Sequence, residues 1–362
     1  MSETTGALTS RTGADAVPSP SLDQVREYIR ASKAENTLRG YQSDWRGFCQ
    51  WCEAHGLCPM PALPETVAAF IAECASTLKV GSVQRRLNAI TEAHKALGLE
   101  SPTHSPIVTN TMKGIRRTRG VAPAQKAAAL TDDIRAMVDS TDAGLIGLRD
   151  RALVLLGFAG AFRRSELVGL CVEDCAFGND GLTVTLRRSK TDQTGAGRKI
   201  GVPYGSNPET CPVRAMQAWI EELQGADARC RVATPESNAL PDSSALSGHV
   251  HGRTQPPSGP ASLYSPKLLF RSITRHGQIQ PSGLSGGDVA RVVKKLAERA
   301  GLDAAKYAGH SLRAGHATSA AIAGASERSI MNQTGHRSVQ MVRRYIRDGS
   351  LFRENSAGKL GL

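Results

Sequence analysis

The stretch that decides the fold is the C-terminal segment Gly309–Phe352, which reads GHSLRAGHATSAAIAGASERSIMNQTGHRSVQMVRRYIRDGSLF. It carries His310 and Arg313 three residues apart, then His336, and Tyr345 nine residues after that. A guanidinium binds phosphate oxygens through paired hydrogen bonds, an imidazole moves protons, and a phenolic oxygen can attack phosphorus. The segment therefore points to chemistry on a phosphate ester, carried mostly by helices.

Two upstream motifs add to this set. The stretch GAFRRSELVGL contains Arg163 and Glu166, and RRSKTDQTGAGRK contains Lys190. A second arginine would help to neutralise the charge that builds up on a pentacoordinate phosphorus, and a lysine can deliver a proton to a leaving oxygen. No cluster of carboxylates suggests a two-metal centre. The residues fit metal-free cleavage through a covalent tyrosyl intermediate, with no metal and no cofactor.

Each of these residues has a simpler interpretation when it is taken alone. Arg163 could form a surface ion pair with Glu166 one helical turn later. His310 could be a structural histidine, and Tyr345 could be a half-buried aromatic side chain. The joint pattern is far more specific than any single member.

Together the motifs resemble those of the tyrosine recombinases, the phage integrase family that includes Cre and the Xer proteins. GAFRRSELVGL is similar to the first arginine box, HSLRAG to the second, and TGHRSV and VRRYIRD to the segments that carry the last two site residues. The step of 26 residues from His310 to His336 also fits. Ala161 and Phe162 depart from the common pattern, as does a long insertion over residues 224–266.

The resemblance implies a reaction. Tyr345 would attack the scissile phosphate and keep it as a 3′-phosphotyrosyl link, so that no ATP is needed. Lys190, on a β-hairpin, would protonate the 5′-oxygen that leaves. His310 would transfer protons around the tyrosine.

The resemblance also assigns the phosphate-binding groups. Arg163 and Arg313 would hold the non-bridging oxygens, His336 would donate a hydrogen bond to the phosphate, and Glu166 would hold the pocket together. The implied partners are double-stranded DNA and further copies of this chain, as a homotetramer on two recombination sites. No membrane and no small-molecule cofactor are expected.

Two other functions stay open on the sequence. A type IB topoisomerase has a similar pocket but relaxes supercoils without a defined site, and a DNA-binding protein could carry a degenerate pocket. The segment 346–362 resembles the part of the family that docks onto a neighbouring protomer, which favours a recombinase. The complete residue set argues against a non-catalytic protein.

The expected fold is mainly α with a small β-hairpin or sheet, in two domains. Periodic apolar residues predict helices through the first of them, and the strand pattern Leu182–Leu186 pairs with Lys199–Val202 in the second. The boundaries follow from composition: a disordered N-terminus at 1–20, a helical core-binding domain at 21–120, a linker at 121–129, and an α+β catalytic domain at 130–362 with a flexible loop at 224–266 and a docking tail at 346–362.

A basic interval ends the first domain. Between Glu100 and Asp132 no acidic residue occurs, whereas the interval contains Lys113, Arg116, Arg117, Arg119 and Lys126. It could be a solvated linker. With a net charge of +12 for the whole chain, we favour a strap along the DNA backbone, where each neutralised phosphate releases counterions.

Other features are less informative. Aromatic residues make up only 4% of the chain, which disfavours stacking on single-stranded bases. The N-terminus lacks the apolar core of a secretory signal, so we expect a cytoplasmic, nucleoid-associated protein. Cys49 and Cys52 form a C-x-x-C without a second metal-binding pair, and we expect buried free thiols there. His249 and His251 are not expected to bind a metal.

Overall fold

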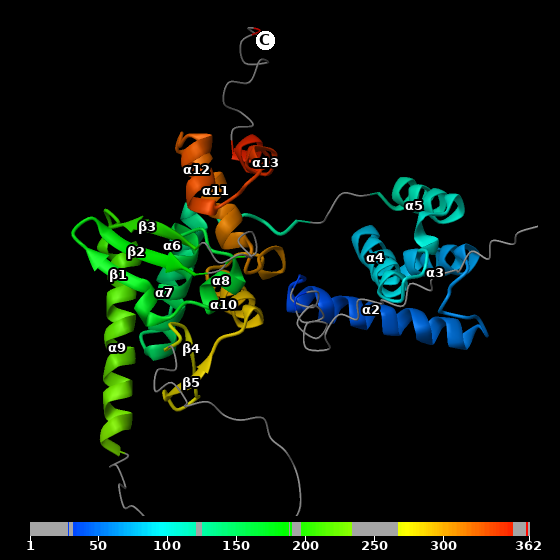
Figure 1. Ribbon diagram of the computed structural model, residues 1–362. Helices are drawn as coiled ribbons and strands as arrows, with labels where there is room; N and C mark the ends of the chain where they lie inside the picture. Colours follow the sequence, from blue (N-terminus) through cyan, green and yellow to red (C-terminus); the bar gives the residue numbers. More distant parts are fainter. Residues whose placement is uncertain are drawn as a thin grey trace, which may run out of the picture. The chain divides into compact units, whose positions relative to one another are not determined.

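The structure is a computed structural model. It describes residues 28, 32–120, 125–187, 189, 197–233, 267–349 and 360, and for residues 230–233 and 347–349 it describes the backbone alone. The chain divides into two compact units, Met1–Ala124 and Gln125–Leu362 (Figure 1). Each unit is described by itself below.

The first unit is helical, as predicted. Its elements are α2 (Glu35–Ala54), α3 (Pro64–Thr77), α4 (Val80–Ala96), a 3₁₀ turn η1 (Pro102–His104) and α5 (Pro106–Arg119). Proline occupies the first turn of α3 and of α5, where its missing N–H has no helical partner to lose. The helix expected over residues 22–29 lies outside the described residues, apart from the helical Tyr28.

One apolar core joins the helices of the first unit. Phe48 of α2 packs edge-on against Phe70 of α3, with ring centroids 5.0 Å apart. Buried Val83, Leu87 and Ile90 line the inner face of α4, and Val108, Met112 and Ile115 line that of α5. Their spacing of three and four residues is the helical periodicity from which the bundle was predicted.

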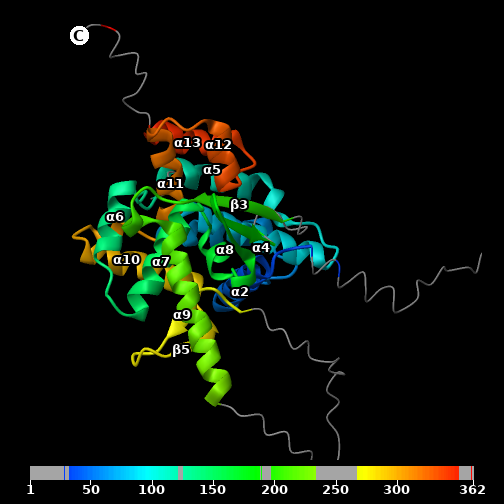
Figure 2. The same cartoon turned by 90° about the vertical axis from the view of Figure 1, so that its left-hand side faces the viewer.

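The second unit combines helices with two small sheets. In chain order its elements are α6 (Thr131–Asp139), α7 (Leu145–Ala159), α8 (Arg164–Val168), η2 (Val172–Asp174), β1 (Cys175–Gly178), β2 (Gly181–Leu186), β3 (Arg198–Pro203), η3 (Pro208–Thr210), α9 (Pro212–Ala233), β4 (Arg271–Ile273), β5 (Ile279–Gly283), α10 (Gly286–Arg299), η4 (Ala304–Lys306), α11 (Ser311–Ile322), α12 (Glu327–Thr334) and α13 (Val339–Gly349). Helix α7 is buried for most of its length and packs along α9. Helices α11, α12 and α13 lie together at one end of the unit in both views (Figures 1 and 2).

The predicted β-hairpin is confirmed. Strands β2 and β3 are antiparallel, with Leu182 opposite Val202 and Val184 opposite Ile200, and these four side chains are buried. Strand β1 adds a third strand on the other side of β2, and β4 and β5 form a separate two-stranded sheet, neither of which was predicted.

The predicted loop at 224–266 begins too early, because α9 continues to Ala233. A single glycine, Gly225, does not end a helix, and the first proline after Pro212 is Pro235. Asp227 also anchors this part of the helix, since it pairs with Arg271 at 2.7 Å and with Lys267 at 2.9 Å. Residues 234–266 lie outside the described residues.

The segment expected to be a linker is partly docked onto the second unit. The backbone N–H of Ala127 donates to Lys306, and that of Ala129 donates to Ser311 at 3.0 Å. This close approach is possible because Gly315 faces the segment: a Cβ at that position would lie 1.7 Å from the carbonyl oxygen of Ala129. Residues 125–129 therefore belong to the second unit, whereas 121–124 lie outside the described residues.

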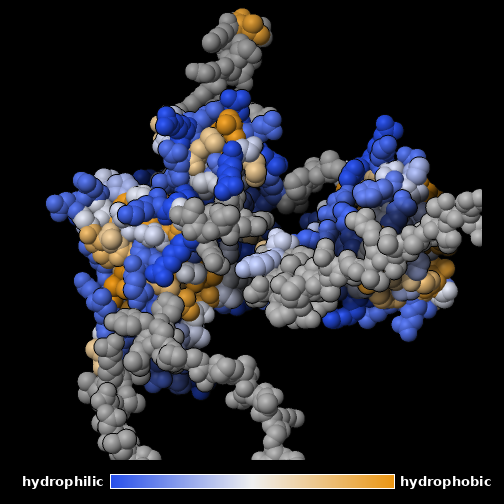
Figure 3. Space-filling model, in the orientation of Figure 1, coloured by the Kyte–Doolittle hydropathy of each residue, from blue (hydrophilic) through white to orange (hydrophobic). Residues whose placement is uncertain are grey.

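The face drawn in Figure 3 is largely hydrophilic, with apolar side chains among charged ones over α11–α13. Val339 and Met341 of α13 are exposed. No helix in the described ranges is long and apolar enough to cross a membrane. The expected docking tail lies outside the described residues beyond Gly349, except for exposed Leu360.

Candidate active site

The turn between α7 and α8 holds the first arginine. Arg163 is the N-cap residue of α8, and its backbone N–H donates to Glu166 Oε2 at 2.9 Å. Its Nη1 donates to Glu166 Oε1 at 2.6 Å. The Glu166 side chain is only 2% exposed, so a buried carboxylate accepts hydrogen bonds from both the backbone and the guanidinium of Arg163. The ion pair that seemed an alternative to a functional role is present, and it fixes the direction of the guanidinium.

Arg313 lies deeper, on the first turn of α11. It is 1% exposed, and its Nη1 donates to the carbonyl oxygen of Ala161 at 2.6 Å. Ala161 presents this oxygen from a left-handed backbone conformation with φ 50°, which is uncommon for a residue with a Cβ. Burial and then the charge of Arg163 lower the pKa of Arg313 to about 10, so it remains a cation at neutral pH.

His310 meets the tyrosine. His310 precedes α11 and Tyr345 lies on α13, and the Nε2 of the histidine is 3.2 Å from the phenolic oxygen. Burial lowers the pKa of His310 below its usual value, and the charges of Arg313, Arg163 and Arg164 lower it further. A neutral imidazole in this position can accept the proton of the phenol.

His336 follows the left-handed Gly335 that ends α12. Its Nδ1 lies 2.8 Å from Thr334 Oγ1, and its Nε2 lies 3.3 Å from Arg313 Nη2. Burial, and then the charge of Arg313, lower the pKa of His336 to about 4. An arginine can only donate, so His336 is neutral here, accepts at Nε2 and donates from Nδ1 to Thr334.

Six of the seven predicted catalytic residues therefore come together from separate elements of the second unit. They are Arg163, Glu166, His310, Arg313, His336 and Tyr345, which are linked in pairs by the contacts described above. The seventh, Lys190, lies in the connection between β2 and β3, outside the described residues. Within the described ranges, no group of three or more His, Cys, Asp or Glu side chains is placed to hold a metal ion.

A further cation near this group was not predicted. Arg198, the first residue of β3, donates from Nη1 to the carbonyl oxygens of Asn332 at 3.0 Å and Gln333 at 3.2 Å. The charges of Glu166 and Arg163 both act on it. Arg198 stands in the same basic stretch as Lys190, but no pattern in the sequence distinguishes it from its neighbours.

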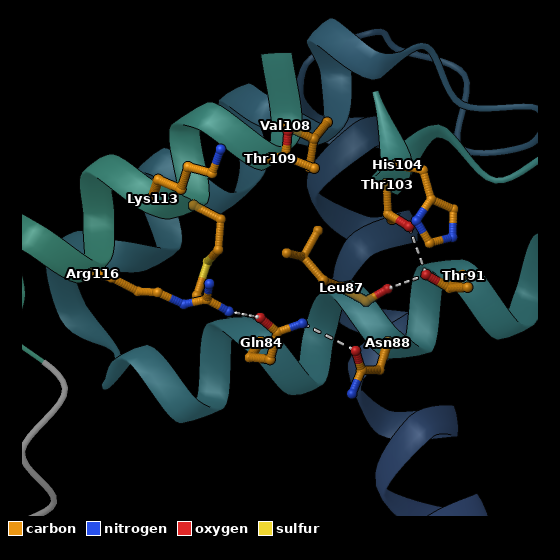
Figure 4. A pocket seen from close by; sticks show the side chains of 11 residues that line it. Gln84, Leu87, Asn88, Thr91, Thr103, His104, Val108, Thr109, Lys113 and Arg116 are labelled. Carbon is orange, nitrogen blue, oxygen red and sulfur yellow. Dashed lines mark hydrogen bonds between the residues drawn. The ribbon is translucent and has the colours of Figure 1, made fainter. Parts of the chain in front are cut away.

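The predicted DNA-binding residues lie on the first unit. Lys113, Arg116, Arg117 and Arg119 are all exposed on the last turns of α5. Lys113 and Arg116 border a groove of about 350 Å³ between α4 and α5 (Figure 4). Arg116 Nη2 donates to Gln84 Oε1 at 2.7 Å, and Gln84 Nε2 donates to Asn88 Oδ1 at 3.1 Å. Amides and cations therefore line the groove together with apolar and hydroxyl side chains.

The C-x-x-C pair does not form a disulfide or a metal site. Cys49 and Cys52 are both free thiols, and burial raises the pKa of Cys52 to about 11. Cys52 is fully buried in the core of the first unit, as expected, while Cys49 is half-buried.

Comparison with known proteins agrees with this geometry. The phage integrase family matches residues 129–350. An integrase/recombinase xerD homolog of Selenomonas ruminantium is 37% identical over 341 residues, which cover 93% of this chain and 89% of that protein. The recombinase cre of Escherichia phage P1 is 24% identical and covers 92% of this chain and 90% of its own length.

A solved structure has the same fold. The Tn1549 transposon integrase, in complex with transposon right end DNA, superposes with a TM-score of 0.55 at 17% identity, over 94% of this chain and 98% of that one. Nothing in these comparisons supports a topoisomerase or a non-catalytic protein.

Proposed function

This chain belongs to the phage integrase family and is a site-specific DNA recombinase, and we propose that it cuts and rejoins duplex DNA through Tyr345. The observation that carries the proposal is the 3.2 Å contact between the phenolic oxygen of Tyr345 and Nε2 of neutral His310, next to two arginines. A nucleophile within hydrogen-bond reach of a base is the arrangement that covalent catalysis requires.

The Tyr345 oxygen bonds to the scissile phosphorus while His310 accepts the phenolic proton, and the bond from phosphorus to the 5′-oxygen breaks. Lys190 supplies the proton to that leaving oxygen. The product is a 3′-phosphotyrosyl link, which a free 5′-hydroxyl attacks in the reverse sense to rejoin DNA.

Two guanidiniums would hold the phosphate. Each arginine has five N–H donors; Arg313 uses one on Ala161 and one on His336, and Arg163 uses one side-chain N–H on Glu166. The remaining donors have no hydrogen-bond partner among the described residues, and they would bind the non-bridging oxygens. In a water-excluded pocket such fixed donors stabilise the charge of the transition state more than they would in water.

His336 must change its hydrogen bonds to take part. Its Nε2 accepts from Arg313 in this structure, so it can donate to a phosphate only after it gains a proton or shifts its tautomer. An incoming phosphate anion favours the protonated imidazole, because an opposite charge nearby raises the pKa of histidine. We infer that His336 becomes a donor when DNA binds.

DNA contacts outside the pocket would come from the first unit. The groove between α4 and α5 presents Gln84 and Asn88 together with Lys113 and Arg116. Glutamine and asparagine recognise base edges, while lysine and arginine neutralise phosphates. We propose that four copies of the chain act on two sites, and that the segment 346–362 contributes to their assembly.

A suicide substrate tests the proposed nucleophile. This is a duplex nicked so that the cut strand diffuses away and the covalent intermediate accumulates. The Tyr345→Phe variant should bind this DNA normally and form no adduct on a denaturing gel, because only the phenolic oxygen is missing. An adduct of normal yield in the variant would remove Tyr345 from its role.

A further inference from the structure

Arg198 connects the β-hairpin to the segment that carries His336. It opens β3, where its backbone pairs with Leu186, and its side chain reaches the end of α12. There Nη1 donates to the last carbonyl oxygens of the helix, those of Asn332 and Gln333. A cation at the C-terminus of a helix satisfies carbonyl groups that have no helical partner and also suits the helix dipole.

The same guanidinium lies flat against the next turn. Gly335 has φ 64° and ψ 36°, and a Cβ placed on it would lie 2.8 Å from Cζ of Arg198. While the guanidinium keeps this position, no side chain larger than hydrogen fits between Arg198 and the backbone immediately before His336. The contact therefore helps to fix the backbone turn at Gly335, and with it the position of His336 after the end of α12.

A second anchor makes the connection rigid. Gln333 Nε2 donates to the carbonyl oxygen of Ala159 at 2.8 Å and to that of Gly201, on β3, at 3.1 Å. The end of α12 is thus tied to β3 at two points and to α7 at one. Removing Arg198 should loosen the turn without detaching α12.

Arg198 also affects the site through its charge. Its Nη2 is buried and has no hydrogen-bond partner among the described residues. The Arg198 charge is among those that lower the pKa of His336 and of Arg313. A buried N–H without a partner costs free energy. The presence of an arginine at this position therefore indicates a role that a neutral side chain would not fill.

We propose that Arg198 is a positioning residue: it fixes the turn at Gly335 so that His336 is presented to Arg313 and to the scissile phosphate. It acts through His336 and does not itself move a proton. The inference rests on the proposed function, because it concerns the same phosphate pocket.

A double-mutant cycle tests this dependence. Single-turnover formation of the covalent adduct is measured for Arg198→Met, His336→Ala and the double variant. Arg198→Met should slow the adduct by roughly 10- to 100-fold, as expected when a catalytic group is misplaced by about 1 Å. In the His336→Ala background the same change should have little further effect, because the residue through which Arg198 acts is gone. Losses that multiply, or a full rate in Arg198→Met, would overturn the proposal.

Controls separate positioning from loss of folding and from failure of the proposed reaction. Arg214→Met removes an exposed arginine that stacks on Tyr204 in the same unit, and it should keep the full rate. Arg198→Lys keeps the charge but not the paired hydrogen bonds, and it should recover part of the rate. If Tyr345→Phe still forms the adduct, the proposed reaction fails, whatever the cycle shows.

A titration of His336 gives a readout that a purely structural role would not change. In spectra of histidine-labelled full-length protein, assigned with His336→Ala, the pKa of His336 should rise from about 4 when Arg198 becomes methionine. It should stay near that value in Arg198→Lys. An unchanged pKa in folded Arg198→Met would count against the contact.

Discussion

At the scale of single residues, the site depends on neutral histidines beside fixed cations. Burial and the arginine charges hold the pKa of His310 below its ordinary value of about 6.5. A base with a lowered pKa is in its active, unprotonated form at all pH values above that pKa. It loses this form only when the pH falls through the lowered value.

The rate of adduct formation should therefore stay level from pH 8 down through 6.5, the ordinary value, and should fall only at lower pH, as His310 gains its proton. The measurement is a single-turnover pH profile with the suicide substrate. In His310→Asn the acid limb should vanish along with most of the rate. A rate that increases as the pH drops through this range would contradict the role of His310 as a base.

Glu166 is predicted to act mainly by aligning Arg163. Glu166→Gln keeps the shape of the side chain but removes the charge that aligns the guanidinium. Adduct formation should slow by roughly 10- to 100-fold, as for other misplaced groups, with DNA affinity unchanged in a mobility-shift assay. The control is Glu209→Gln, which removes the exposed partner of Arg151 and should leave the rate as it is. Equal effects of the two changes would exclude a specific role for Glu166.

At the scale of elements, the start of helix α11 positions two residues of the site, and the segment before α6 packs against this helix. His310 and Arg313 flank its start, and the backbone of Ala129 donates to Ser311 beside them. This packing depends on Gly315, because a Cβ there would lie 1.7 Å from the backbone oxygen of Ala129, which cannot move independently of its chain.

Gly315→Ala should therefore destabilise the second unit by about 3 kcal/mol or more, the upper end for overpacking. The matched change is Gly225→Ala in α9, where the only atoms within 4 Å of the new Cβ belong to the end of the Arg229 side chain. That change should stabilise by about 0.5–1 kcal/mol, because glycine is unfavourable inside a helix. Chemical denaturation of the full chain measures both. A stable Gly315→Ala variant would show that Ala129 is not seated as described.

The helices and the site residues differ in how far the sequence predicts them. Long helices follow from apolar residues at spacings of three and four. The sequence predicts helices at about 287–300, 311–323 and 326–333, and α10, α11 and α12 begin and end within one or two residues of these positions. Strands β4 and β5 were missed because they are short and do not alternate in burial. Arg198 was missed because its role depends on a contact 134 residues along the chain, with Asn332, and no local pattern encodes such a contact.

At the scale of the whole molecule, the residues proposed for catalysis and those proposed to contact the DNA backbone through α5 belong to different units. The six described residues of the proposed active site lie in the unit Gln125–Leu362, whereas the basic end of α5 lies in Met1–Ala124. A family motif locates the first group directly. The second rests on charge and exposure, which indicate phosphate contacts but no target sequence.

Charge reversal at Arg116 and Arg117 should weaken binding to all DNA sequences alike. If each contacts one phosphate, the slope of log K against log salt should become shallower by about 2. Reversal of exposed Arg229 and Arg275 in the second unit changes the net charge equally and should leave the slope nearly unchanged. If the slope changed equally in both double variants, the effect of Arg116 and Arg117 would be one of net charge alone.

The most direct test of the central claim is the chemical identity of the covalent link in the unaltered protein. The adduct formed with a suicide substrate is digested with protease and nuclease, and mass spectrometry locates the nucleotide on the protein. We expect a nucleotide joined through its 3′-phosphate to the tyrosine of the peptide that contains Tyr345. A nucleotide on another residue such as Tyr307, or one joined through a 5′-phosphate, would contradict it.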